Sequence, residues 1–251
     1  MGVHIYPHKD PSGDFRLGRR FGSTEYIYPG DASASPYHFW GPALAADVSI
    51  KPARIRIFID FWNFSLSLRR LDDTFKIDWS KVSSILTREA AAVLPNGSGS
   101  LFEALHVYGS FDPNKPADAK FKKWFTTWLD RQPGVHISLV ERQRKKGFPK
   151  CPSCQGEIPH CPTCSADMRG TEEKGVDTRI VTDMISLAWS NGYEAAVIVS
   201  SDRDFVPVAD FLQTKGIKVV HAAFPPIGSQ LSQRCWGNFS VPKVMNEIRL
   251  P

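Results

Sequence analysis

The sequence predicts an α/β fold with a mainly parallel central sheet of about five strands. Short β-branched runs alternate with segments of helical periodicity along most of the chain. The turns that link them are short, as in strand–helix–strand units whose helices cover both faces of a sheet. The length of 251 residues, with 42% hydrophobic and 23% charged residues, fits one globular domain with additions or two small domains.

Each element is justified by its local pattern. β-branched, apolar runs predict strands at 54–60, 101–110, 135–142, 195–200 and 217–224. Apolar residues at helical spacing predict helices at about 78–94, 117–130, 176–190 and 204–215. Residues 1–50 are rich in Gly, Pro, Ser and Tyr and predict an irregular arm, so the main domain is expected over 51–251 with an insertion at 143–172. The chain shows no internal repeat at this level.

The helix expected at 117–130 carries a row of large apolar residues. The row recurs at i, i+3, i+4, i+7 and i+8 and consists of Phe121, Trp124, Phe125, Trp128 and Leu129. This spacing favours packing against the core. The alternative is a platform on which nucleobases stack.

Acidic residues follow the ends of separate predicted elements. Asp60 ends the first strand, and Asp202 and Asp204 follow the fourth. The helix at 176–190 must begin at the same edge of the sheet, and Asp177 lies in its first turn on the apolar side. Ligands bind where parallel strands end, so we expect these four acids to converge there.

Taken singly, each acid has a structural explanation. Asp202 or Asp204 could cap the next helix, Asp177 could favour a helix dipole, and Asp60 could be a turn residue. A cluster of carboxylates, however, needs a cation to neutralise it, and Mg²⁺ or Mn²⁺ prefers such ligands. A centre of this kind hydrolyses phosphate esters.

Polar and basic residues near these acids are candidates for substrate binding. Asn63 and Ser201 could hydrogen-bond a carboxylate or a phosphate, although turn formation is an equally good explanation. The run RQRKKGFPK (142–150) could bind RNA phosphates or form a solvated loop. Its candidate residues are Arg142, Arg144, Lys145 and Lys146. The formal net charge of +5 also suggests an anionic partner.

The segment CPSCQGEIPHCPTC (151–164) contains two Cys-x-x-Cys pairs. The four thiolates that would hold one structural, tetrahedral Zn²⁺ are Cys151, Cys154, Cys161 and Cys164. The alternative is a redox dithiol. Clustered cysteines and the lack of an apolar leader favour a reducing, cytoplasmic location. No apolar stretch approaches the roughly 18–20 residues of a membrane span.

Three stretches together resemble the NYN domain family of PIN-like ribonucleases, particularly its bacterial branch: FIDFWNF, EKGVDTRIVTDMI and VSSDRDFVPVADFLQTKGIKVV. The resemblance covers about 54–224, excluding the insertion, and implies a PIN-like α/β/α sandwich; the cysteine spacing adds to it a small zinc-binding, zinc-ribbon-like insertion. The resemblance also implies a metal-dependent endoribonuclease, with the family's acids carried over onto Asp60, Asp177, Asp202 and Asp204 and its Asn onto Asn63. Where many relatives have Gly after the first Asp, this chain has Phe61.

The function predicted from the sequence is therefore hydrolysis of RNA phosphodiester bonds by an aspartate-held Mg or Mn centre, with Zn as a structural metal. The alternative is a non-catalytic RNA-binding or scaffolding module that uses the zinc loop and its basic stem. A phosphohydrolase of the haloacid dehalogenase type would need Asp-x-Asp after the first strand, where position 62 is Trp. RNA is the expected partner, without a membrane, and a homodimer is left open.

Overall fold

The computed structural model describes residues 51–95 and 99–251. The arm expected at 1–50 lies outside the described residues. Within the described ranges, no helix is both long and apolar enough to cross a membrane.

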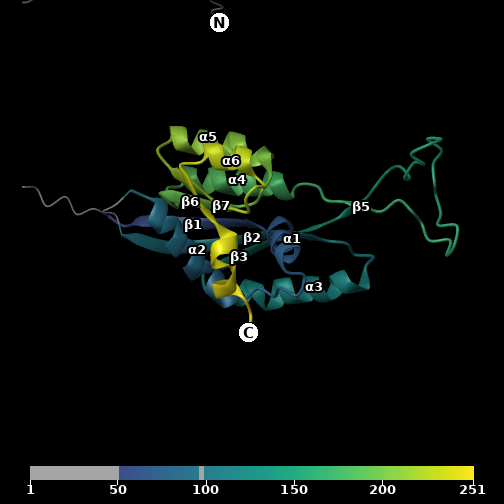
Figure 1. Ribbon diagram of the computed structural model, residues 1–251, viewed down its shortest axis with the longest axis horizontal. Coiled ribbons are helices and arrows are strands. Elements are labelled where there is room, and N and C mark those ends of the chain that lie inside the picture. Colours follow the sequence, from purple (N-terminus) through teal and green to yellow (C-terminus); the bar gives the residue numbers. More distant parts are fainter. Residues whose placement is uncertain (1–50, 96–98) are drawn as a thin grey trace, which may run out of the picture. The chain divides into compact units, whose positions relative to one another are not determined.

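A six-stranded sheet forms the centre of the domain, in the order β3-β2-β1-β6-β7-β8, and every neighbouring pair is parallel (Figure 1). Its strands are β1 (Ala53–Asp60), β2 (Ser100–Phe111), β3 (Val135–Glu141), β6 (Ala195–Val199), β7 (Lys218–Ala223) and β8 (Gly237–Ser240). The expected sheet was one strand short. β8 has only four residues, of which Phe239 alone is buried and apolar, so it carries too little periodicity to be recognised.

Helices cover both faces of the sheet, as the predicted fold class requires (Figure 1). The helices are α1 (Phe61–Leu71), α2 (Trp79–Val93), α3 (Pro116–Thr127), α4 (Val176–Trp189), α5 (Val206–Thr214), α6 (Ser229–Arg234) and α7 (Val241–Val244). Three 3₁₀ turns, η1 (Leu129–Arg131), η2 (Arg203–Phe205) and η3 (Met245–Ile248), complete the domain. The sequence did not predict α1, α6 or α7.

Alternation along β1 creates the two cores. Ile55, Ile57 and Ile59 point to the face covered by α1, α2 and α3, whereas Phe58 points to the face covered by α4 and α5. All four side chains are fully buried, and burial of each contributes roughly 1.5–3 kcal/mol. This packing fixes the strand ends and therefore the residues that follow them.

The aromatic row of α3 divides between core and surface. Phe125 and Leu129 are fully buried, as core packing predicts. Phe121 and Trp124 are half-buried, and Trp128 remains 44% exposed.

The insertion begins and ends at a two-stranded antiparallel ribbon, β4 (Gln143–Arg144) and β5 (Thr171–Glu172). Beyond it, the chain extends away from the sheet (Figure 1). The expectation of no internal repeat was wrong here, because PKCPSCQGEI (149–158) and PHCPTCSADM (159–168) fold alike. The Ile158 N–H donates to the Pro149 carbonyl, and the Met168 N–H donates to the Pro159 carbonyl. A ten-residue period with few identical positions is difficult to see without these bonds.

Candidate active site at the carboxyl ends of β1 and β6

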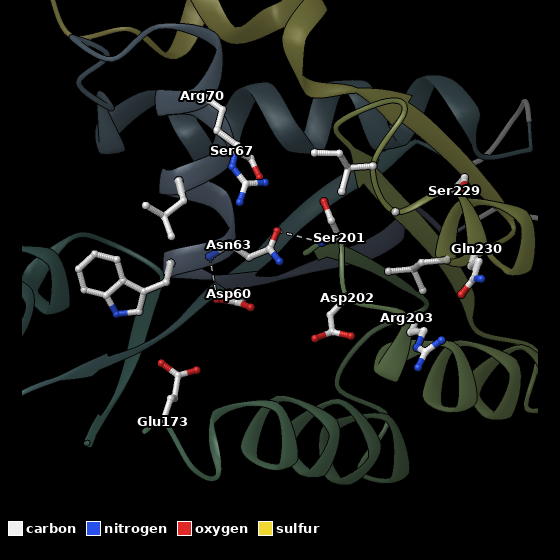
Figure 2. Close-up of a pocket in the computed structure, with 15 residues that line it drawn as sticks. Asp60, Asn63, Ser67, Arg70, Glu173, Ser201, Asp202, Arg203, Ser229 and Gln230 are labelled. Carbon is white, nitrogen blue, oxygen red and sulfur yellow. Dashed lines mark hydrogen bonds between the residues drawn. The ribbon is translucent and has the colours of Figure 1, made fainter. Parts of the chain in front are cut away.

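The direction of strand addition reverses between β1 and β6. From β1 the chain builds outward through β2 and β3, and it then returns to the other side of β1 with β6. Such reversal points leave a crevice beyond the strand ends, where ligands bind in open α/β sheets. A cleft of about 600 Å³ lies there (Figure 2). Its polar and charged lining includes Asp60, Asn63, Arg70, Glu173, Ser201, Asp202 and Arg203.

Asp60 is the last residue of β1, whereas Asp202 stands three residues beyond the end of β6. Each is the N-cap of the helical segment that follows it: Asp60 Oδ1 accepts the Asn63 N–H at 3.1 Å, and Asp202 Oδ1 accepts the Asp204 N–H at 2.9 Å. The capping explanation therefore holds for Asp202, yet both carboxylates also line the cleft. A cap fixes one oxygen of each carboxylate and so orients the whole group.

The acids influence one another electrostatically. The pKa of Asp60 is raised to about 6, mainly by burial and also by the nearby carboxylates of Glu173 and Asp177. Burial also raises the pKa of Asp177, with added contributions from Asp202, Glu173 and Asp204. These mutual effects mean that the predicted acids share one region of negative potential.

Three acids lie away from the cleft lining: Asp177 in the first turn of α4, Asp204 and Asp183. Asp204 lines a separate hollow beside Val206 and Pro207. Asp183, six residues after Asp177 on α4, accepts a hydrogen bond from the Tyr108 hydroxyl at 3.0 Å and one from Arg179 at 3.2 Å. Asp183 is thus occupied by structural partners.

A buried histidine organises the turn after β6. His221 on β7 contacts the Ser200 carbonyl through Nε2 at 2.8 Å and the Ser232 hydroxyl through Nδ1 at 2.7 Å. Burial lowers the pKa of His221, so the ring is neutral, with Nε2–H donating to the carbonyl and Nδ1 accepting from Ser232. The Ser200 hydroxyl in turn donates to Asp60 at 3.4 Å and accepts the Asp202 N–H at 3.2 Å.

Asn63 and Ser201, both predicted to bind substrate, are bonded to each other. The Asn63 side-chain oxygen accepts the Ser201 N–H at 2.9 Å (Figure 2). The Ser201 hydroxyl is buried and has no partner among the described residues. Gly228, at φ +75°, packs against this turn so closely that a Cβ would lie 3.1 Å from the Ser201 Cα. Only glycine fits both the backbone angle and the space.

Sequence reasoning missed three charged residues of the cleft. Glu173 lies one residue beyond β5, and its carboxylate accepts a hydrogen bond from the Ser110 hydroxyl at the end of β2. Arg70 reaches the cleft from α1, and Arg203 from η2 (Figure 2). Neither arginine has an acidic partner within 4.0 Å in the described part of the chain. The spacing of Asn63, Ser67 and Arg70 on one helical face was the available signal.

The predicted basic stem is only partly directed to the cleft. Arg142 lies 3.8 Å from the Glu173 carboxylate, so it borders the acidic cluster. Arg144 instead pairs with Asp167 in the insertion at 3.5 Å. Lys145 and Lys146 are exposed and have no ion pair in the described ranges.

The four insertion cysteines lie in two equivalent turns and are not paired as disulfides. Backbone N–H groups of residues 153 and 154 lower the pKa of Cys151, and those of 163 and 164 lower the pKa of Cys161. Such turns stabilise thiolates. Among the residues described, no three His, Cys, Asp or Glu side chains are gathered closely enough to form a metal-ligand group, either here or in the cleft.

The fold and the cleft together define a PIN-like α/β/α protein with an acidic crevice at its strand reversal. Residues 54–239 match the NYN domain, and the chain belongs to this family, whose fold is that of PIN-like nucleases. A solved structure of a protein of unknown function from Vibrio parahaemolyticus is similar to it, with a TM-score of 0.51 and 17% identity. That match covers 80% of this chain and 99% of the other, and it supports the fold alone. No curated protein sequence matches the chain.

Proposed function

We propose that the protein is a metal-dependent endoribonuclease that hydrolyses RNA phosphodiester bonds in the cleft beyond the carboxyl ends of β1 and β6. The observation that carries this proposal is the grouping of Asp60, Glu173 and Asp202 around one cleft at the strand reversal. Membership of the NYN family supports a nuclease that acts on RNA with a divalent metal.

The donor set fits Mg²⁺ or Mn²⁺. Mg²⁺ keeps several waters and needs only one or two protein carboxylates together with substrate phosphate, so a cleft without a cage of three ligands suits it. Asp60 and Asp202 would bind the ion directly, and Asp177 and Asp204 would do so directly or through water. The ion would polarise a phosphoryl oxygen and favour ionisation of the attacking water.

The other residues of the cleft have separate roles in this proposal. Arg70 and Arg203 bind the phosphates on either side of the bond to be cleaved, because both line the cleft and lack acidic partners among the described residues. The unpartnered Ser201 hydroxyl donates to a phosphate oxygen. Lys145 and Lys146 add sequence-independent contacts to the RNA backbone, as does Arg142 at the rim.

Two metals with different roles, one catalytic and one structural, are part of the proposal. The catalytic ion occupies the cleft, whereas one Zn²⁺ joins the two cysteine turns of the insertion. Equivalent folding of residues 149–158 and 159–168 supports a shared function for the two turns. Zinc there would be structural, since four thiolates leave no open position.

The test is incubation of the protein with RNA or single-stranded DNA in Mn²⁺, Mg²⁺ or EDTA. The proposal expects RNA cleavage that EDTA abolishes and Mn²⁺ restores. Cleavage that survives chelation would contradict the metal centre. Tight, salt-dependent RNA binding without any cleavage would instead favour the non-catalytic module, which the exposed Lys145 and Lys146 could serve.

A further inference from the structure

A second hollow lies on the other side of α1 from the acidic cleft. Asn63, Ser67 and Arg70 face the cleft, whereas Phe61, Ser65 and Arg69 line this groove of about 460 Å³. Its remaining lining comes from the loop before α2, the start of α2, the helix α3 and Leu250. The groove is mainly apolar and aromatic.

Two indoles form a ridge at its edge. Trp124 and Trp128 stack with their ring centroids 5.9 Å apart and their planes 18° apart. They line the groove on one side and a smaller hollow with Lys120 and Lys123 on the other. A flat, exposed face such as that of Trp128 is the surface on which unpaired nucleobases stack.

Ser65 gives an independent indication of a polar ligand. It lines the groove, only 6% of it is exposed, and its hydroxyl has no hydrogen-bond partner among the described residues. A buried hydroxyl without a partner is destabilising, and a base edge or ribose hydroxyl would satisfy it.

The charge around the groove suits a polyanion. Arg69 and Lys76 line it, Lys120 and Lys123 border the adjoining hollow, and none of the four has an acidic partner within 4.0 Å in the described ranges. Asp78 is the acid in the lining, and it is already engaged by Ser80 and Lys81. The net charge is therefore positive beside exposed aromatic rings.

An aromatic path joins the groove to the cleft. Trp62 lines the cleft, and its ring centroid lies 5.0 Å from that of Phe121, which lines the groove. The two hollows are separated by the width of one helix, about 10–12 Å. A strand held in the cleft would need only a few more nucleotides to reach the groove.

From these observations we propose that the groove between α1, α2 and α3 binds single-stranded RNA, stacking its bases on Trp128 and Trp124. This inference rests on RNA being the ligand of the cleft, but not on its cleavage. The groove would bind the part of the strand that runs on from the cleft, and it would favour unpaired RNA over duplex.

The test compares Trp128→Ala with Trp189→Ala, a matched change at a tryptophan 78% exposed at the end of α4. Binding of a labelled single-stranded 12-nucleotide RNA is measured in EDTA, so that cleavage does not interfere. We expect Trp128→Ala to weaken binding roughly 5- to 100-fold, Trp128→Phe to restore most of it, and Trp189→Ala to change little. Replacing Lys120 and Lys123 together by Ala should lower the salt dependence.

Other outcomes separate the two proposals. Equal RNA binding by Trp128→Ala and Trp189→Ala would contradict the proposal that the groove binds RNA, even if the protein cleaves RNA. A change in oligomeric state or thermal stability with unaltered RNA binding would also overturn it, because the groove would then be covered by protein. Loss of binding in Trp128→Ala, with no cleavage by the unaltered protein, would support the groove and contradict the nuclease.

Discussion

The side-chain oxygen of Asn63 accepts the backbone N–H of Ser201 at 2.9 Å, and this bond ties the helix after β1 to the turn after β6. β1 and β6 are neighbours at the point where the direction of strand addition reverses. The bond therefore joins two residues that line the proposed active site. Asn63 therefore holds the two cleft-lining segments together, and its side-chain oxygen already has a hydrogen-bond partner.

Replacing Asn63 by Ala should lower the free energy of unfolding by about 1–2 kcal/mol, because the Ser201 N–H loses its partner. Cleavage should fall as well, since the turn carrying Asp202 is less well held. Urea unfolding and initial cleavage rates measure the two effects. Asn238→Ala, on the exposed side of β8, is the control and should change neither. Unchanged stability in Asn63→Ala would contradict a positioning role.

Asp60 should make the stability of the metal-free protein depend on pH. Its pKa is about 6 in the folded protein and near its ordinary value of 3.8 when unfolded, so the folded state binds the extra proton. The contribution of Asp60 to the free energy of unfolding is therefore present at low pH and is lost as the pH rises through about 6. Relative to Asp60→Asn, the wild type should lose roughly 2 kcal/mol of stability between about pH 4.5 and 7.5.

Denaturation in EDTA at those pH values measures this difference. An equal pH dependence in wild type and Asp60→Asn would mean that Asp60 is not buried among the other acids. With excess Mn²⁺ the trend should weaken, because the cation favours the ionised carboxylate.

Glu173→Gln should weaken Mn²⁺ binding about tenfold, because it removes one carboxylate of the cleft while keeping a group that Ser110 can contact. Calorimetric titration of the metal measures the change. Glu172→Gln is the adjacent control, since Glu172 pairs with Lys174 at 2.7 Å and does not line the cleft. Equal affinities in the two variants would exclude Glu173 from the metal environment.

The acids show how far the sequence alone predicts this site. Asp60 and Asp202 could be placed because Asp60 ends one apolar strand and Asp202 follows the end of another by three residues, and strand ends share one edge of a parallel sheet. Glu173 could not, because its position depends on the bond to Ser110 across the base of the insertion. Arg70 was missed because α1 starts directly after β1, with Asp60 serving both as the last residue of the strand and as the N-cap of the helix.

In the fold, too, elements with a clear local pattern were predicted and those held by long-range contacts were not. The five strands expected from long apolar runs are all present. β8 was not predicted because it is held by pairing with β7, and its own four residues show no apolar alternation. The paired cysteine turns could be predicted from their spacing, and equivalent backbone hydrogen bonds show that the repeat extends over ten residues.

The zinc proposal predicts one Zn²⁺ per chain, lost when Cys151 and Cys161 are both replaced by Ser. The stability of the central sheet should change little, because the insertion extends away from it (Figure 1). Elemental analysis and thermal unfolding measure the two quantities, with Cys235→Ser as the control for zinc content. Full zinc retention by the double variant would contradict the assignment.

The most direct test of the account is the rate at which Asp202→Asn cleaves single-stranded RNA in Mn²⁺, compared with Asp73→Asn at an exposed loop position. Asn preserves the size of the side chain and its capping oxygen, so only the charge is removed. The account predicts that Asp202→Asn loses at least about 100-fold in rate, or roughly 2.7 kcal/mol, while Asp73→Asn cleaves like the wild type. Equal rates for Asp202→Asn and the wild type would show that the cleft beyond the carboxyl ends of β1 and β6 is not the catalytic centre.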